Sequence, residues 1–247
     1  MKGLLFKEFY LTRKTYLGFL GLFIGVASLC ALTALSMICG NLQETAMKSP
    51  EIVDSYFQMF TYIPLLALMF AVQAVETSVY MDYASGWMKY SYSTALSMKK
   101  VIGVRYLAGF IILVISMVLG FANAGLIGLI LNKTITADMV KNILLIGIIG
   151  TVFMFIDIPM ALKFKTAQKV QNLEGTVFLV GYIVIVGFFF LKMADMNEDM
   201  SEQYLKSILA KAMDIRDILL PLCPILLLVL FALSFWTSVR LYQRREK

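Results

Sequence analysis

The sequence predicts an all-α integral membrane protein, and three observations lead to that prediction. Of the 247 residues, 60% are hydrophobic, whereas about 45–50% is usual in soluble domains. Charged residues make up only 15%, and the mean hydropathy is +0.81. Uncharged stretches of about 20 residues, which is the length that crosses a bilayer as a helix, recur along the chain. This composition excludes disorder and a nucleic-acid-binding tail.

We expect six membrane-spanning helices in a single transmembrane domain that covers residues 1–247. Helices are expected because the backbone must satisfy its own hydrogen bonds in hydrocarbon, and the sequence lacks the alternating ten-residue segments of a β-barrel. The expected spans are 16–41, 57–78, 104–131, 142–162, 175–193 and 218–239. The first is too long for the core of a cleavable signal peptide, so we expect it to stay in the mature chain. The prolines at positions 64, 159, 221 and 224 are expected to bend helices or end helical turns.

The basic residues are distributed unevenly among the segments between the spans. Of the 22 Lys and Arg residues, 15 lie in the N-terminal stretch, the second and fourth connections and the C-terminal tail. Positive charge is retained in the cytoplasm, so we expect both termini to be cytoplasmic. An even number of spans agrees with this placement. The predicted location is a plasma membrane, which the chain crosses several times.

The N-terminal residues 1–15 are predicted to form an interfacial helix. Four apolar residues lie on one helical arc, and Lys7 and Lys14 lie opposite, as in basic amphipathic segments at anionic lipid. The alternative is an ordinary positive flank that only sets the topology.

The connection after the second span is the most informative segment. Tyr80, Tyr83, Trp87, Tyr90 and Thr94 recur at intervals of three and four, which on a helix makes one stripe. The segment 80–101 is therefore predicted to form a short helix that docks onto a cytoplasmic partner. It ends in an interfacial basic pair, Lys99 and Lys100. The alternative is that these aromatic residues simply collect at the membrane interface.

Two further segments suggest packing roles. Residues 195–217 have the spacing of an amphipathic helix on the extracellular side, which is either a lid over the exit or a plain solvent-facing helix. Gly21 and Gly25 form a small-xxx-small pair that is a candidate for helix packing or dimerisation, and Ala124 and Gly128 form another. Asp157 is the only charge well inside an expected span, and we interpret it as a structural anchor near the cytoplasmic boundary.

The sequence contains no histidine, and it contains no phosphate-binding loop of the G-x-x-x-x-G-K-[ST] type. The motifs of serine hydrolases, zinc proteases and Cys-x-x-Cys redox proteins are also missing. We therefore expect no catalytic residues, no metal site and no cofactor in this chain. The three cysteines lie in or at the edges of apolar segments and are interpreted as small buried hydrophobic residues.

The residues Asp82-Tyr-Ala-Ser-Gly-Trp-Met-Lys-Tyr90, followed by Ser97-Met-Lys-Lys-Val-Ile102 and Arg105-Tyr-Leu107, resemble the cytoplasmic signature of type-two ATP-binding-cassette exporter permeases. Thr94-Ala95 stand where Leu-Pro is common in that family, and Arg105 replaces a lysine. The stretch 159–165 is similar to the family's Pro-x-x-Phe-Lys-Phe-Gly segment, with Thr166 where glycine is usual. The size and layout are similar to those of bacterial exporter permeases for phenol-soluble modulins and antimicrobial peptides.

This resemblance implies a permease subunit that dimerises, with a second subunit expected to be identical, and that binds two copies of a separate cytoplasmic ATPase. ATP and magnesium would bind to that ATPase. The family's coupling helix would correspond to residues 80–101. The docking residues implied by the resemblance are Trp87, Lys89, Tyr90, Tyr92, Thr94 and Ser97. The cargo implied is an amphipathic peptide or another hydrophobic compound, and the location implied is a bacterial plasma membrane.

A different class of function stays open from the residues alone. An ion-coupled secondary transporter, or a membrane scaffold that transports nothing, would also have six spans and cytoplasmic termini. Secondary transporters usually contain several buried ionisable groups and internal repeats. The sequence shows one intramembrane carboxylate and no convincing repeat.

Overall fold

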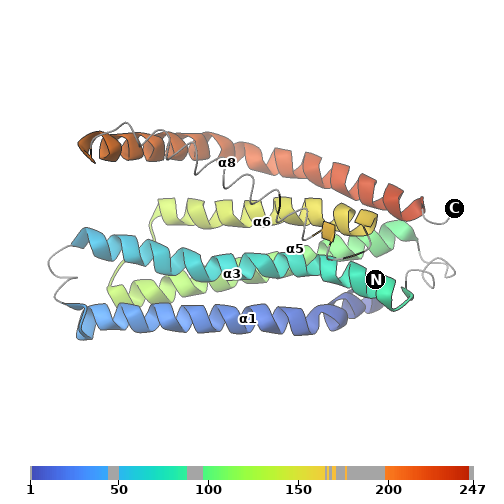
Figure 1. Cartoon of the computed structure of the whole chain (residues 1–247), viewed down its shortest axis with the longest axis horizontal. Helices are drawn as coiled ribbons and strands as arrows, with labels where there is room; N and C mark the ends of the chain where they lie inside the picture. Colours follow the sequence, from blue (N-terminus) through green and yellow to red (C-terminus); the bar gives the residue numbers. More distant parts are fainter. Residues whose placement is uncertain are drawn as a thin grey trace.

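The computed structural model describes residues 2–43, 50–87, 97–164, 166, 169–170, 176 and 198–244. These residues form long α-helices that lie side by side in a bundle (Figure 1). The helices are α1 (Lys2–Cys39), α3 (Pro50–Ala84), α5 (Met98–Leu131), α6 (Ala137–Phe164) and α8 (Glu198–Gln243). The described part of the chain contains no strand, in agreement with the predicted all-α class.

The helices are longer than a bilayer requires. α1 has 38 residues and α8 has 46, which at 1.5 Å per residue gives about 57 Å and about 69 Å. Within the described residues, four helical segments are long and apolar enough to cross a membrane, namely Lys2–Cys39, Met98–Leu131, Ala137–Phe164 and Met213–Gln243. The expected second span, 57–78, lies inside α3. The expected fifth span, 175–193, lies almost entirely outside the described residues.

Helices α3, α6 and α8 run in one direction along the bundle, and α1 and α5 run in the other (Figure 1). The start of α1 and the end of α8 therefore lie at the same end of the bundle, which we call the proximal end. The end of α3 and the start of α5 lie there as well. The distal end holds Cys39, the loop between α5 and α6, and the start of α8.

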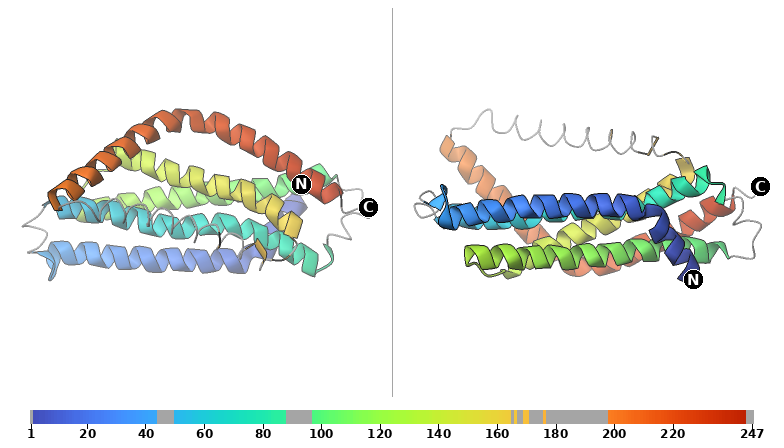
Figure 2. Two further views of the ribbon diagram at one scale, coloured as in Figure 1. Left: turned by 45° about the horizontal axis from the view of Figure 1, so that its top comes forward. Right: turned by 90° about the horizontal axis from the view of Figure 1, so that it is seen from below.

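Two pairs of segments that were predicted as separate elements form single helices in the structure. Residues 2–15 and the first expected span form the single helix α1, whose N-terminal part turns away from the axis of the rest (Figure 2). Residues 198–217 and the last expected span form the single helix α8, which bends in its middle (Figure 2). No proline interrupts 2–39, and neither glycine nor proline interrupts 198–220. Nothing in either stretch therefore ends a helix, and Pro221 and Pro224 lie inside α8, as expected of prolines that bend a helix.

The aromatic stripe expected over the coupling segment 80–101 does not lie on one helix, and residues 88–96 of that segment are outside the described residues. α3 continues to Ala84, and a turn follows in which Gly86 has φ 72°. Glycine adopts this left-handed conformation without steric cost and commonly ends helices. Tyr80 and Tyr83 therefore belong to α3, and Trp87 lies beyond the turn. The predicted docking residues Lys89, Tyr90, Tyr92 and Thr94 lie outside the described residues.

Helix α5 packs against α1, α3 and α6, and small residues on it allow the close approach. A Cβ atom on Gly128 would lie 2.7 Å from the carbonyl oxygen of Lys133 and 3.4 Å from the ring of Phe57 in α3. Ala124, one turn earlier, is fully buried. The small pair in the third expected span therefore packs inside this chain.

Candidate functional site

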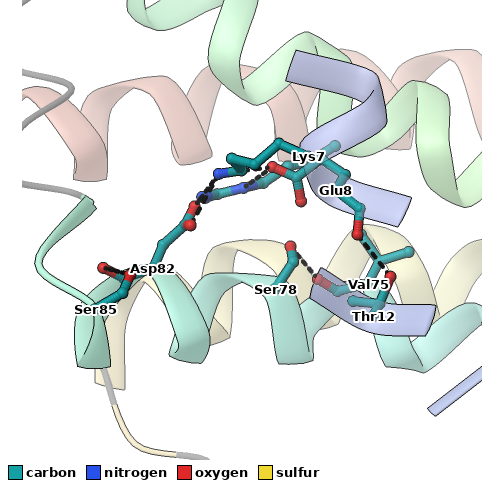
Figure 3. Close-up of polar contacts among 8 residues, drawn as sticks. Lys7, Glu8, Thr12, Val75, Ser78, Asp82 and Ser85 are labelled. Atoms are coloured by element: carbon teal, nitrogen blue, oxygen red, sulfur yellow. Dashed lines mark hydrogen bonds and ion pairs between the residues drawn. The ribbon is translucent and has the colours of Figure 1, made fainter. Parts of the chain in front are cut away.

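Four charged side chains, three buried and one half-buried, lie together at the proximal end. Lys7 and Glu8 come from α1, Asp82 from the last turn of α3, and Arg105 from the second turn of α5. The Asp82 and Arg105 side chains are 0% exposed, and those of Glu8 and Lys7 are 4% and 18% exposed. Figure 3 shows Lys7 and Glu8 facing Asp82 across the gap between α1 and α3. We call these four residues the proximal charge cluster.

Each charge in the cluster lies next to an opposite charge. The Lys7 Nζ atom donates to both carboxylate oxygens of Asp82 at 2.8 Å, and it lies 3.2 Å from Oε1 of Glu8. The Arg105 guanidinium donates through Nη2 to Asp82, and its Nε lies 3.6 Å from Oε1 of Glu8. Two cations and two carboxylates sum to no net charge. Buried ions need such partners because transferring a charged group from water to the protein interior costs about several kcal/mol per ion.

The helical spacing within α1 and α3 directs the polar side chains of these two helices toward each other. Asp82 lies one turn after Ser78, and both face α1 (Figure 3). Thr12 lies one turn after Glu8 and donates its hydroxyl to the Glu8 carbonyl at 2.7 Å, so its polar atom is satisfied within α1. Because α3 and α5 are joined by residues 85–97, the ion pair between Asp82 and Arg105 closes the base of that connection.

The carboxyl group of Asp82 depends on its cations. Asp82 lies beyond the expected span 57–78, and burial raises its pKa above the ordinary value, while Arg105 and Lys7 act in the opposite direction. Loss of either cation would raise the pKa further, because the desolvation would stay and the attraction would go.

Lys7 also reaches across the turn that follows α3. Its Nζ lies 4.8 Å from the ring centroid of Trp87, which is a cation–π distance. Tyr83, on the other side of the turn, donates its hydroxyl to the carbonyl of Leu162 at 3.2 Å, near the end of α6. The start of the 85–97 connection is thus held by α1 on one side and by α6 on the other.

The structure brings together only some of the residues predicted to act at this end. Trp87 contacts the cluster through Lys7. Ser97 is the exposed N-cap residue of α5, and its side chain makes no capping hydrogen bond. Lys99 and Lys100 are exposed in the first turn of α5, and Lys14 is exposed on α1. Lys7, predicted on the polar face with Lys14, instead points into the bundle.

The predicted packing pair on α1 lies on an open face. A Cβ atom on Gly21 or Gly25 would meet no other heavy atom within 4 Å. Both glycines are exposed in the single chain, so this face is free within it.

The sequence analysis did not predict that Glu8, Asp82 and Arg105 are buried charges. Arg105 and Asp82 are noted above only for the resemblance, and Glu8 is not singled out. One signal was present, because Glu8 is the only acidic residue in the otherwise basic stretch 1–15. Asp157, interpreted as a boundary anchor, is buried in α6 with 2% exposure. The described residues contain no group of three His, Cys, Asp or Glu that could hold a metal ion.

Two other features lie away from the cluster. At the distal end, Arg216 of α8 donates to Asp138 at 2.7 Å and to Asn142 at 2.9 Å, which links α8 to α6. An apolar cavity of about 810 Å³ opens between α5, α6 and α8. Its lining includes Phe110, Met117, Phe155, Leu228 and Phe231.

The described residues form a bundle of long apolar helices, and the ends of α3 and α5 that flank the 85–97 connection are joined by a buried ion pair. A family model described as "ABC-2 family transporter protein" matches residues 3–243. This match covers nearly the whole chain, so the chain belongs to that family and is a permease component of an ABC transporter. Such a permease is a membrane subunit that works with a partner ATPase. A search of curated proteins finds no match.

Proposed function

We propose that this chain is the permease half of an ATP-driven exporter in the bacterial plasma membrane, with both termini in the cytoplasm. Two copies would dimerise and bind two copies of a separate cytoplasmic ATPase, which holds ATP and magnesium. The observation that supports this most directly is the proximal charge cluster. It fixes both flanks of the 85–97 connection, where the resemblance puts the ATPase-docking segment.

The proposed coupling is mechanical. Trp87 and Ser97 border the connection, and with Lys89, Tyr90, Tyr92 and Thr94 they would fit a groove on the ATPase. Because Asp82 and Arg105 pair across the base of the connection, a displacement of the docking segment acts on α3 and α5 as one unit. A connection with loose flanks would absorb the same displacement without moving the helices.

The proposed cargo is an amphipathic peptide of the kind exported by the phenol-soluble-modulin and antimicrobial-peptide permeases. The apolar cavity between α5, α6 and α8 supports a hydrophobic cargo. It is almost entirely apolar, and its volume of about 810 Å³ falls within the range of ligand pockets. The face of α1 that carries Gly21 and Gly25 is open and supports a permease–permease contact.

The test uses the permease and a partner ABC ATPase, sought first in the neighbouring genes, reconstituted in vesicles with a dye-labelled amphipathic helical peptide as the probe. Trp87→Ala and Tyr90→Asp should reduce co-purification of the ATPase and its permease-stimulated hydrolysis. Replacing the phosphate-loop lysine of the ATPase should abolish uptake of the probe. The proposal fails if both permease variants bind and stimulate the ATPase normally. Uptake that survives the ATPase variant and is abolished by a protonophore would indicate an ion-coupled transporter instead.

A further inference from the structure

The N-terminal part of α1 has a contact that the docking role does not explain. One ammonium group, Nζ of Lys7, touches residues on both sides of the turn that ends α3. It donates to both oxygens of Asp82 before the turn, and it lies over the ring of Trp87 after the turn. These two residues are five positions apart, and the φ of 72° at Gly86 lies between them. A lysine on a different helix therefore holds the fold of this turn.

The geometry makes Lys7 sensitive to any movement of Trp87. The attraction between an ammonium group and an indole ring falls off when the cation leaves the ring face. The ion pair with Asp82 anchors the other side of the ammonium group, because Asp82 is 0% exposed and is also held by Arg105. If Trp87 moves, Lys7 must either follow it and strain the pair with Asp82, or stay and lose the ring.

We propose that Lys7 is a positioning residue for energy coupling: it ties the N-terminal part of α1 to Trp87, so that this helix moves with the docking segment when the ATPase closes. This inference rests on the proposed function, and it adds a third helix to the two that the docking segment joins. It also gives the bend in α1 a role, because the part of α1 that carries Lys7 turns away from the rest of the helix (Figure 2).

The experiment compares hydrolysis with transport in the reconstituted complex. Lys7→Met keeps the length of the side chain and removes its charge, Lys7→Arg keeps the charge, and Lys2→Met is the matched control because Lys2 is an exposed lysine on the same helix. The readout is transport per ATP hydrolysed, so it does not depend on how much ATPase Lys7→Met binds. Transport of the labelled peptide per ATP should fall about tenfold, the effect of losing one strong cation–π contact. Lys7→Arg should restore it, and Lys2→Met should leave it unchanged.

A double-mutant cycle separates positioning from plain stability. Trp87→Leu removes the ring and leaves the pair between Lys7 and Asp82. Because Trp87 is also a proposed docking residue, all variants are compared as transport per ATP hydrolysed by the complexes that form, so weaker docking does not enter the ratio. If Lys7 acts through Trp87, adding Lys7→Met to Trp87→Leu causes no further loss of transport per ATP. If the two losses multiply, the proposal is wrong. Normal transport by a Lys7→Met protein that binds the ATPase would overturn it as well.

Two controls keep the result decisive. If Lys7→Met alone does not fold, the charge-balanced pair Lys7→Met with Asp82→Asn replaces it, with Asp82→Asn as its reference, because Arg105 and Glu8 still compensate each other. If the wild-type permease neither binds the ATPase nor transports, the proposed function has failed and this inference falls with it. If the wild type couples normally and the Lys7 variants do too, only this inference fails.

Discussion

At the scale of single residues, the proximal charge cluster determines how tolerant this end of the bundle is to substitution. A buried ion that loses its partner costs more than a pair removed together, because the lone charge keeps its desolvation penalty. Arg105 illustrates this, since it is fully buried and faces Asp82 and Glu8 at once. Exposed lysines close by, such as Lys99, stay hydrated and have no such desolvation penalty.

We predict that Arg105→Met lowers the stability of the permease by about 3 kcal/mol, because it leaves two carboxylates with one cation. Lys99→Met should change the stability by less than about 0.5 kcal/mol. Asp82→Asn combined with Arg105→Met should cost less than the sum of the single changes, since Lys7 and Glu8 still balance. Thermal unfolding in detergent measures the wild type, the three single variants and the double variant. Strictly additive losses would show that the cluster is not one coupled unit.

The same cluster predicts a pH dependence. Burial already raises the pKa of Asp82, and removal of Arg105 takes away the first of the two opposing influences. A carboxyl whose folded-state pKa lies above its unfolded value costs stability in full above the folded-state pKa. That cost shrinks as the pH falls through the folded-state pKa and is gone below the unfolded-state pKa. The deficit of Arg105→Met relative to wild type should therefore shrink as the pH falls from neutrality toward about 4, the ordinary range of an Asp carboxyl. The Asp82→Asn, Arg105→Met double variant should lack this trend, and a deficit that grows on acidification would contradict the assignment.

At the scale of helices, the positions of the apolar runs predicted which parts of the chain are helical. They did not predict where the helices begin and end, and the structure explains why. The helices α1, α3, α5, α6 and α8 each contain an apolar run that the sequence predicted to be helical, because a run of apolar residues must be helical in hydrocarbon. Hydropathy does not mark where a helix continues into the polar boundary. For that reason the sequence divides α1 and α8 into separate elements, although no helix-breaking residue separates them.

The charge cluster was hidden from sequence reasoning for a related reason. Its four members lie at positions 7, 8, 82 and 105, and none of them shares a periodic stripe with another. Only the antiparallel packing of α1 and α5 against α3 brings them together. The turn after α3 does carry a local sequence signal, because Gly86 interrupts the aromatic stripe and α3 ends at Ala84, two residues before it.

Two glycines on different helices should respond differently to the same change. Gly128→Ala places a Cβ atom against the Lys133 carbonyl, which the backbone must shift to accommodate, so we expect a loss of about 1–3 kcal/mol. Gly25→Ala meets open space within the chain and should leave the stability unchanged or raise it by up to about 1 kcal/mol. Unfolding temperatures in detergent test this difference.

A bulkier change extends this test to assembly. If the Gly21–Gly25 face contacts a second permease, Gly25→Leu should lower the dimer fraction in light scattering while the monomer stays folded. An unchanged dimer fraction would rule this face out as the interface.

At the scale of the whole molecule, the bundle has two different ends. The proximal end holds the charge cluster among α1, α3 and α5, where both partners of the Asp82–Arg105 pair are fully buried. The distal end pairs Lys133 with Asp54, Lys141 with Asp217, and the buried Arg216 with Asp138, and in each of these pairs the carboxylate is exposed. Buried charge fixes the proximal helices relative to one another. Exposed ion pairs contribute little, with a median of about 0–1 kcal/mol, so the distal ends of the helices are held less firmly. This asymmetry agrees with the proposed coupling, in which the ATPase acts on the proximal end.

The orientation of the two ends in the membrane is the prediction on which the coupling scheme depends. The proximal end should face the cytoplasm, because most of the basic residues flank it. In a protein whose Cys30, Cys39 and Cys223 are replaced by alanine, a single cysteine is introduced at Thr134, which is exposed in the distal loop, or at Lys99, which is exposed at the proximal end. A membrane-impermeant maleimide should label Thr134→Cys in intact cells, and it should label Lys99→Cys only after permeabilisation. The reverse pattern would place Trp87 outside the cell, where no cytoplasmic ATPase can reach it, and would refute both the docking role and the role of Lys7.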